Sequence, residues 1–218
     1  ALARQAVSES LVLLKNEDAL PLAADATTIF VAGSAADDIG IQSGGWTIEW
    51  QGGTGDITIG TTILEGITAV AGTDTHIAFE RLGRFESIHD AAGNPAMADY
   101  GIVIVGEEPY AEWEGDNAYL ALSRGDRTTI ERVREQSEKL IVIVVSGRPL
   151  VITEPLNLAD AVVAAWLPGT EGAGVADVLF GAVPFTGTLP FTWLRSADQL
   201  PFDFANLSTE GCDAPLFP

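Results

Sequence analysis

Five carboxyl groups and two aromatic rings crowd the twelve residues 106–117 (GEEPYAEWEGDN), directly after the apolar run 102–105. Tyr110 and Trp113 stand among the acidic residues, which are Glu107, Glu108, Glu112, Glu114 and Asp116. Rings that exclude water from a carboxyl group raise its pKa, and a raised pKa suits a general acid. The segment therefore predicts either part of an acid-base active site or, as for most charge runs, a solvated acidic loop.

Two tryptophans, Trp46 and Trp50, lie four residues apart in the glycine-rich stretch 44–55 (GGWTIEWQGGTG). Most tryptophan side chains are largely buried, so one interpretation places both rings in the core. The flanking glycines favour another, because core tryptophans usually lie on regular elements, and an exposed indole stacks well on the apolar face of a sugar. The loop 41–60 is also long for an ordinary connection. We expect at least one of the two rings to be a ligand platform.

Other familiar sites find little support in the sequence. His76 and His89 are the only histidines, and their spacing does not suggest a metal site. Ser34 and Ser146 lie outside a G-x-S-x-G nucleophile elbow, which argues against a serine hydrolase. Neither G-x-G-x-x-G nor a P-loop motif is present, so nucleotide binding is a distant alternative. We expect no metal and no cofactor.

The composition is that of a folded globular protein, with 47% apolar and 19% charged residues in a chain of 218. Eleven basic residues against thirty-one acidic ones give a net charge of −20, which repels nucleic acid and anionic lipid. No apolar run approaches the ~18 residues that a membrane span needs. We therefore expect neither a nucleic-acid nor a membrane partner. Cys212 is the only cysteine, which excludes an internal disulfide.

Short apolar runs rich in valine and isoleucine predict the strands of the fold. Runs that do not alternate with polar residues are typical of parallel strands covered on both faces. Helical patterns separate them, and an amphipathic pattern at the start predicts a first helix that ends near Asn16. The predicted strands are 28–33, 75–79, 101–106, 140–147 and 161–169, and the other predicted helices are 61–71, 123–138 and 171–180.

This order of elements predicts an α/β fold, a three-layer sandwich whose mainly parallel central sheet is covered by helices on both faces. We expect residues 1–218 to form a single domain cut from a longer protein, because the chain opens without an initiator methionine and stops abruptly in DAPLFP. Ligands of such sheets bind beyond the carboxyl ends of the strands. The segments expected to meet there are 34–56, 107–117, 146–149 and 167–172.

Motifs along nearly the whole chain carry a family resemblance. They include LVLLKN, GGWTIEWQG, VGEEPYAEWEGDN, SGRPLVI and WLPGTEG. Together they resemble the C-terminal α/β-sandwich domain of family-three glycoside hydrolases, most nearly the exo-acting β-glucan glucohydrolases and β-glucosidases. WLPGTEG with LVLLKN is quite specific for the family, and GGWTIEWQG indicates the exo-glucanase branch.

The resemblance implies a retaining mechanism on β-linked glucosyl units, with two essential carboxyl groups from different domains. The nucleophilic aspartate would come from a preceding (β/α)8-type barrel, and its motif is not found in this sequence. Glu112 falls on the general acid/base position. Glu108 is the second choice because it lies nearer the strand end, and Glu107 and Glu114 stay open. The domain alone is expected to be nearly inactive.

The resemblance also implies where sugar binds. In the exo-glucanase branch, a tryptophan of the GGWTIEW stretch stacks on the sugar at the aglycone side. Trp50 is the better match, whereas Trp46 either joins it or supports the loop, and Glu108 is a further expected substrate-binding residue. The expected partners are a β-glucan or β-glucoside substrate and an N-terminal barrel of the same chain, in a secreted or periplasmic setting. The alternative function is a non-catalytic carbohydrate-binding or structural domain.

Overall fold

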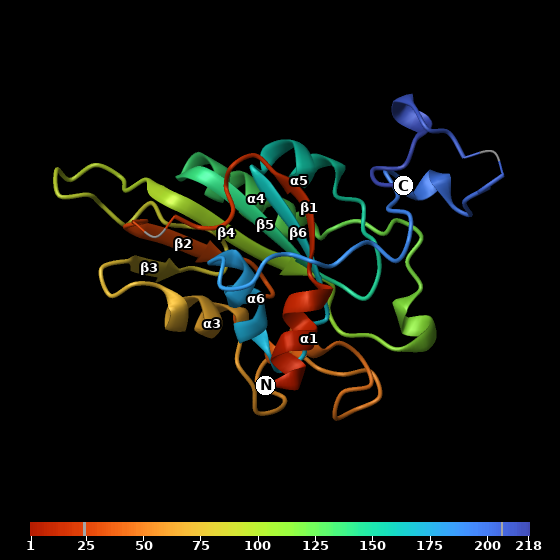
Figure 1. The fold of residues 1–218 in the computed structure, drawn as a ribbon, viewed down its shortest axis with the longest axis horizontal. Helices are drawn as coiled ribbons and strands as arrows, with labels where there is room; N and C mark the ends of the chain where they lie inside the picture. Colours follow the sequence, from red (N-terminus) through yellow and green to blue (C-terminus); the bar gives the residue numbers. More distant parts are fainter. Residues whose placement is uncertain (24, 206) are drawn as a thin grey trace.

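The computed structural model describes residues 1–23, 25–205 and 207–218. In these ranges six strands form one sheet in the order β1-β6-β5-β4-β2-β3 (Figure 1). β1 runs antiparallel to β6, and every other neighbouring pair is parallel. The strands are β1 (Val12–Asn16), β2 (Thr28–Ala32), β3 (His76–Phe79), β4 (Ala98–Gly106), β5 (Ser137–Val145) and β6 (Ala161–Trp166).

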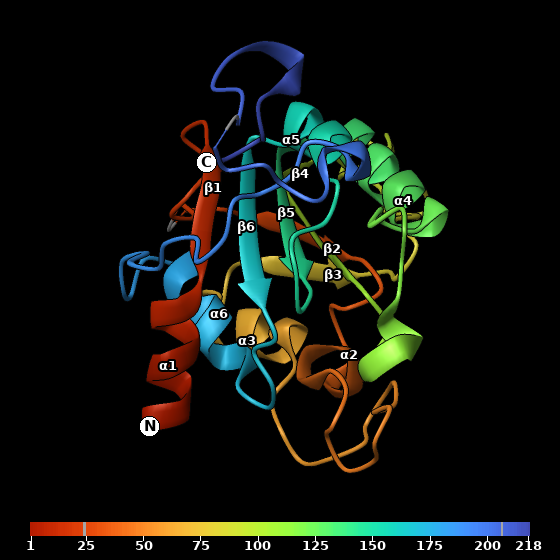
Figure 2. The ribbon, with the colours of Figure 1, turned by 90° about the vertical axis from the view of Figure 1, so that its right-hand side faces the viewer.

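Helices cover both faces of the sheet (Figure 2). One layer contains α1 (Leu2–Ser10), α3 (Ile63–Val70) and α6 (Gly172–Leu179), and the other contains α4 (Arg124–Glu135) and α5 (Thr153–Leu158). The predicted three-layer α/β sandwich is therefore confirmed. None of the helices in the described ranges is long and apolar enough to cross a membrane. The shorter helices are α2 (Ile39–Ser43), η1 (Glu112–Gly115), η2 (Ala197–Gln199) and η3 (Gly211–Asp213).

Successive residues of the central strands enter two separate cores. Ile102 and Ile104 of β4 pack in the core beneath α1, α3 and α6, whereas Val103 and Val105 pack in the core beneath α4 and α5. All four side chains are fully buried. Because side chains alternate between the faces of a strand, a strand covered on both sides needs an unbroken apolar run. The run 102–105 meets that need.

The first helix is shorter than the sequence pattern predicts. α1 ends at Ser10, and the chain from Val12 to Asn16 forms β1 in place of the last predicted turns. Leu11 and Val12 are buried in opposite cores, which is the habit of a strand covered on both faces. A short apolar run does not by itself distinguish a strand from a buried helix. The antiparallel hydrogen bonds with the edge of β6 favour the strand.

The other predicted elements are found. The five predicted strands correspond to β2 to β6, and the three later helices correspond to α3, α4 and α6. β4 and β5 each begin three residues before the predicted start, at Ala98 and Ser137. Polar residues such as Asp99 and Glu138 lie near the starts of these strands, so a search for apolar runs misses the first three residues of each strand. The sequence pattern does not predict α2 and α5, which are only five and six residues long.

From the neighbouring strands β2 and β4, the chain continues toward opposite edges of the sheet. β2 leads through α2 and α3 to β3 on one side, and β4 leads through α4 to β5 on the other. The carboxyl ends of β2 and β4 are therefore a topological switch point, where such sheets leave a crevice. Segments that follow four strands do meet at this edge, as predicted. Gly44, Glu107, Gly147 and Leu167 line one small cavity together.

Candidate active site

The acidic segment forms an arch, residues 107–117, which leaves the end of β4 and turns through η1. Glu112 opens η1 with a φ of 53°, in the left-handed region that non-glycine residues seldom adopt. Gly115 closes the turn against the ring of Tyr110, so closely that an added Cβ would lie 2.3 Å from a ring carbon. The arch is a compact turn packed on its own tyrosine.

Arg148, just beyond β5, joins the two ends of the arch. Its Nη2 donates to Oε1 of Glu107 over 2.6 Å, and its Nη1 donates to the carbonyl oxygen of Gly115 over 2.6 Å. Its guanidinium carbon lies 4.6 Å from the centre of the Tyr110 ring. The Tyr110 hydroxyl donates to Oε2 of Glu107 over 3.1 Å. Burial and the Glu107 carboxylate raise the pKa of Tyr110 to about 12, so the phenol stays protonated.

The tryptophan loop, residues 44–60, is held at both ends by buried polar side chains that precede it. Oδ1 of Asp38 accepts a hydrogen bond of 2.7 Å from the N–H of Gly55. Nε2 of Gln42, in the helix α2 that leads into the loop, donates to the carbonyl oxygen of Gly169 over 2.9 Å, which ties the start of the loop to the segment after β6. Asp38 and Gln42 are at most 3% exposed. These bonds give a long loop a defined path.

The tryptophan loop and the arch are in direct contact. Oε1 of Gln51 accepts a hydrogen bond of 2.7 Å from the N–H of Ala111. Gly45 passes so close to the arch that an added Cβ would lie 1.9 Å from the carbonyl oxygen of Tyr110. Only glycine permits a backbone approach this close. The segments after β2 and β4 therefore form one continuous wall at the edge of the sheet.

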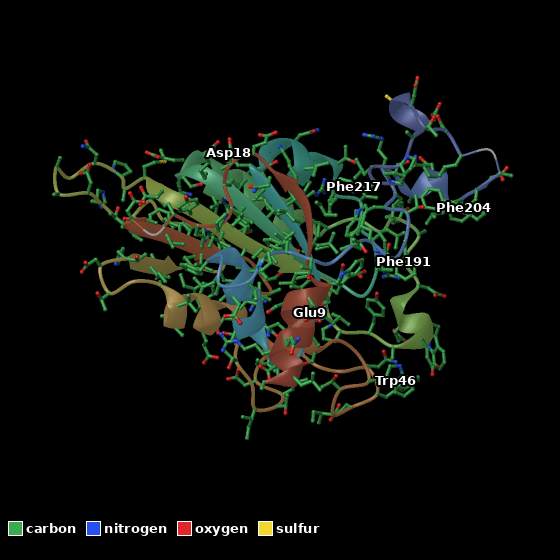
Figure 3. All side chains as sticks on the ribbon, viewed as in Figure 1. Glu9, Asp18, Trp46, Phe191, Phe204 and Phe217 are labelled. Atoms are coloured by element: carbon green, nitrogen blue, oxygen red, sulfur yellow. The ribbon has the colours of Figure 1, made fainter. Side chains whose placement is uncertain are left out.

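Three exposed indole rings gather where the tryptophan loop meets the arch. The ring centroids of Trp50 and Trp113 are 5.1 Å apart in an edge-to-face arrangement, and those of Trp46 and Trp50 are 6.3 Å apart. The exposed fractions are 68% for Trp46, 43% for Trp50 and 60% for Trp113. Figure 3 shows Trp46 on the loop, away from the sheet. The interpretation that buries Trp46 and Trp50 in the core is therefore wrong.

The candidate carboxylates differ in their surroundings. Glu107 is engaged at the base of the arch, with its side chain 14% exposed. The rings of Tyr110 and Trp113 contact the base of the arch and the tryptophan loop respectively, so they do not shield Glu112 from water as the sequence suggested. Four carboxylates of the arch are exposed, and their side chains form no hydrogen bond or ion pair with the described residues: the candidates Glu108, Glu112 and Glu114, and also Asp116.

A cavity of about 410 Å³ lies behind the arch, at the switch point of the sheet. Asp126 in its wall is only 5% exposed, and its carboxylate accepts hydrogen bonds from the hydroxyls of Ser34, over 2.8 Å, and Ser123, over 2.9 Å. Burial raises the pKa of Asp126, although the two hydroxyls oppose that rise. Arg81 and Glu108 also line the cavity. Its wall therefore carries groups of both charges beside the arch.

The remaining candidates do not assemble a second site. His76 begins β3 at the edge of the sheet, and Nδ1 of His89 lies 2.9 Å from the nearby carbonyl oxygen of residue 87. The hydroxyls of Ser34 and Ser146 both donate to neighbouring oxygen atoms, and neither contacts a histidine. Across residues 1–23, 25–205 and 207–218, no group of three or more His, Cys, Asp or Glu side chains could hold a metal ion.

Three residues of the site are not singled out by the sequence analysis: Arg148, Gln51 and Asp126. Arg148 lies in SGRP, one of the segments expected beyond the carboxyl ends of the strands. The rule that ligands bind at that edge of the sheet is therefore the signal that could have found it. Gln51 bonds a residue 60 positions away, and the sequence carries no sign of that pairing. Asp126 is in a polar stretch where a buried carboxylate is not expected.

Comparison with known proteins identifies the family. Residues 11–218 match the glycosyl hydrolase family 3 C-terminal domain. Among solved structures, the exo-1,3/1,4-beta-glucanase from a Pseudoalteromonas species is similar to this chain with a TM-score of 0.82 and 36% identity. The similarity covers 99% of this chain and 27% of that chain.

Two curated relatives are similar over most of this chain. A lysosomal beta glucosidase of Dictyostelium discoideum is 30% identical over 96% of this chain and 27% of the relative. A periplasmic beta-glucosidase of Salmonella typhimurium is 28% identical over 95% of this chain and 30% of the relative. The chain therefore spans less than a third of the length of either. The motif resemblance is confirmed, and the chain belongs to the glycosyl hydrolase family 3 C-terminal domain family.

Proposed function

We propose that this chain is the second domain of a retaining, exo-acting β-glucosidase or β-glucan glucohydrolase, and that Glu112 is its general acid/base. One observation carries the proposal. Glu112 stands exposed on an arch that is braced from below by Arg148 and flanked by three exposed indole rings. Glu107, by contrast, is largely buried and is already engaged by Arg148 and Tyr110.

The chemistry divides between two carboxyl groups. A nucleophilic aspartate of a preceding (β/α)8-type barrel attacks C1 of the glucosyl unit, while Glu112 donates its proton to the departing glycosidic oxygen. The first step leaves C1 bonded to the aspartate; Glu112 then takes a proton from water, which attacks C1, breaks the bond to the aspartate and releases glucose with retained configuration. The two carboxyl groups of a retaining enzyme lie ~5–5.5 Å apart, so the barrel must dock over the arch. An exposed acid/base residue is what a site shared between two domains requires.

Sugar binding falls to the tryptophan loop. Trp50 stacks on the sugar at the aglycone side, and Trp46 extends the same aromatic surface. Glu108, exposed beside the cavity behind the arch, accepts hydrogen bonds from sugar hydroxyls. The similar protein from Pseudoalteromonas is an exo-1,3/1,4-beta-glucanase, which supports a β-glucan substrate for this site.

Several expectations follow from a site shared between domains. Residues 1–218 form one domain of a longer protein, and this domain alone is nearly inactive because it lacks the nucleophile. The parent protein acts outside the cytosol, in a secreted or periplasmic setting, on polymeric glucan. The names of the lysosomal and periplasmic relatives support that location. No cofactor takes part in the reaction.

The exposed indole rings also favour a second candidate function, a non-catalytic carbohydrate-binding domain. Three aromatic rings on one surface can hold a sugar without any chemistry. In that case the parent protein would lose glucan affinity when Trp50 is replaced, but Glu112→Ala would leave every hydrolytic rate unchanged. The two functions are therefore separated by Glu112 and not by the tryptophans.

The proposal is tested by leaving-group dependence in the full-length protein. Glu112→Ala should slow hydrolysis of glucans, whose alcohol leaving groups need a proton, by about 10²–10⁴-fold. Aryl glucosides with activated leaving groups should lose far less in their first step. Glu108→Ala and Glu114→Ala provide matched variants of the neighbouring carboxylates. If one of these shows the leaving-group dependence and Glu112→Ala does not, the acid/base role belongs to that residue.

A further inference from the structure

We infer that Arg148 is the positioning residue of the acid/base arch: it holds Glu112 in place by joining the two ends of the turn that carries it. The inference rests on the proposed role of Glu112. Arg148 contacts Glu107 at the start of the arch and Gly115 at the end of η1, so one guanidinium joins both sides of the turn. No other side chain in the described ranges bonds to both ends.

The backbone of Arg148 is itself anchored in the sheet. β4 and β5 pair in parallel up to Gly106 and Val145, and the N–H of Glu107 donates to the carbonyl oxygen of Val145 over 3.2 Å. Just beyond the end of β5, the hydroxyl of Ser146 donates to the carbonyl oxygen of Arg148 over 2.7 Å. Arg148 therefore begins from a fixed point beside the start of the arch. The Arg148 side chain extends from there to Gly115, so it holds the far side of the turn at a fixed position relative to β5.

The contacts of Arg148 depend on the planar, forked shape of its guanidinium as well as on its charge. Nε lies 3.2 Å from both oxygens of Glu107, Nη2 donates to Oε1, and Nη1 points the other way to Gly115. The guanidinium carbon lies over the Tyr110 ring. A lysine ammonium is a single point charge without this planar fork. It can replace the ion pair with Glu107 but cannot also bond Gly115 and cover the ring.

The turn that Arg148 closes needs such a restraint. Glu112 has a left-handed backbone conformation, which persists in a non-glycine residue only when its surroundings hold it. Between Glu107 and Gly115, the bond from Ala111 to Gln51 is the one other hydrogen bond that the described residues show from the arch to a different segment. Without the guanidinium, Glu107 loses its cation and the carbonyl of Gly115 loses its donor. The turn is then free to relax, and Glu112 moves with it.

A displaced acid has a specific kinetic signature. Misplacing a catalytic group by about 1 Å can cost on the order of 10²-fold in rate. The loss falls on the step that needs the proton, so poor leaving groups suffer and activated aryl glucosides are spared. A general folding defect behaves differently, because it lowers the amount of active enzyme and reduces both rates equally.

The test uses the full-length protein with Arg148→Met and Arg148→Lys. Arg127→Met is the matched control, because this arginine lies on α4 and its exposed ion pair with Glu154 is 3.7 Å long. Both Arg148 variants should lose about 10²-fold or more on glucan and much less on activated aryl glucosides. Arg148→Lys should recover little. Arg127→Met should hydrolyse both substrates at the rates of the unsubstituted protein.

The outcomes separate this inference from the proposed function. If Glu112→Ala shows the leaving-group dependence but the Arg148 variants do not, Arg148 does not position the acid and the inference is overturned. Equal losses on both substrates in Arg148→Met overturn it as well, since they indicate a folding role only. If Glu112→Ala itself shows no leaving-group dependence, it is the proposed function that fails.

Discussion

The indole ring of Trp50 meets that of Trp113 edge to face, with their centroids 5.1 Å apart and their planes at 71°. One ring belongs to the tryptophan loop and the other follows the proposed acid/base residue directly. The contact therefore connects the surface proposed to bind sugar with the turn that carries the proposed acid. Both rings remain partly exposed, so their free faces are available to a ligand.

Replacing Trp113 should weaken sugar binding more than it slows the chemistry. An aromatic contact contributes about 1 kcal/mol, so Trp113→Ala should raise KM for glucan oligosaccharides about five-fold. An equal loss of ground-state and transition-state binding leaves kcat nearly unchanged. Steady-state kinetics of the full-length protein measure both constants.

A double-mutant cycle extends this prediction. Because the two rings touch, Trp50→Ala and Trp113→Ala combined should raise KM by less than the product of the single effects. Phe204→Ala is the control, since this ring is 72% exposed on the separate C-terminal segment (Figure 3). Independent effects of the two tryptophans would show that the ring contact has no part in binding.

Gly45→Ala should disturb the arch from the side of the tryptophan loop. The new methyl group would lie 1.9 Å from the carbonyl oxygen of Tyr110, so the loop and the arch must separate. We expect a loss in kcat/KM on glucan of about 10²-fold, as for a misplaced catalytic group. Gly125→Ala is the control, because its nearest contact would be 3.5 Å away. Full activity in Gly45→Ala would contradict the close junction.

Asp126→Asn should change how stability depends on pH. Burial raises the pKa of Asp126 above its ordinary value of 3.8. A raised pKa in the folded state means that the protonated form is the stabilising one, so its contribution is complete below pH 3.8 and is lost as the pH rises through the folded-state value. Asparagine is neutral throughout. Thermal unfolding should therefore favour the variant over the parent more at about pH 7 than at about pH 4.

Asp126→Ala separates charge from hydrogen bonding in the same experiment. Alanine removes the acceptor of both the Ser34 and Ser123 hydroxyls, which should cost about 1–3 kcal/mol at every pH. Asparagine keeps an oxygen for at least one of them. If Asp126→Asn follows the parent at both pH values, the buried carboxylate does not carry the expected penalty.

The fold could largely be predicted from the sequence. Strands covered on both faces leave unbroken apolar runs such as 140–145, and these were enough to place the sheet and its ligand edge. The error lies at Leu11 and the residues after it, where the same apolar run suits a helix or a strand. The edge of β6 decides between them, and β6 is about 150 residues away in the chain, beyond the reach of any local pattern.

The site could be predicted only in part. The composition of residues 106–117 indicates where the carboxylates gather, and the strand-end rule indicates which segments accompany them. Neither signal indicates that Glu107 pairs with Arg148, because that ion pair depends on how the neighbouring strands β4 and β5 end. Nor does it show that Glu112 is exposed, since the rings beside it in sequence turn toward other partners in space.

Azide trapping tests the central claim most directly. In full-length Glu112→Ala, an activated aryl glucoside should form the glycosyl-enzyme intermediate, but no carboxylate remains to activate water. Azide needs no general base, so it should attack C1 of the intermediate, accelerate turnover and yield β-glucosyl azide, with the configuration retained. Turnover that azide does not accelerate, with no glucosyl azide among the products, would contradict the assignment of Glu112 as the general acid/base.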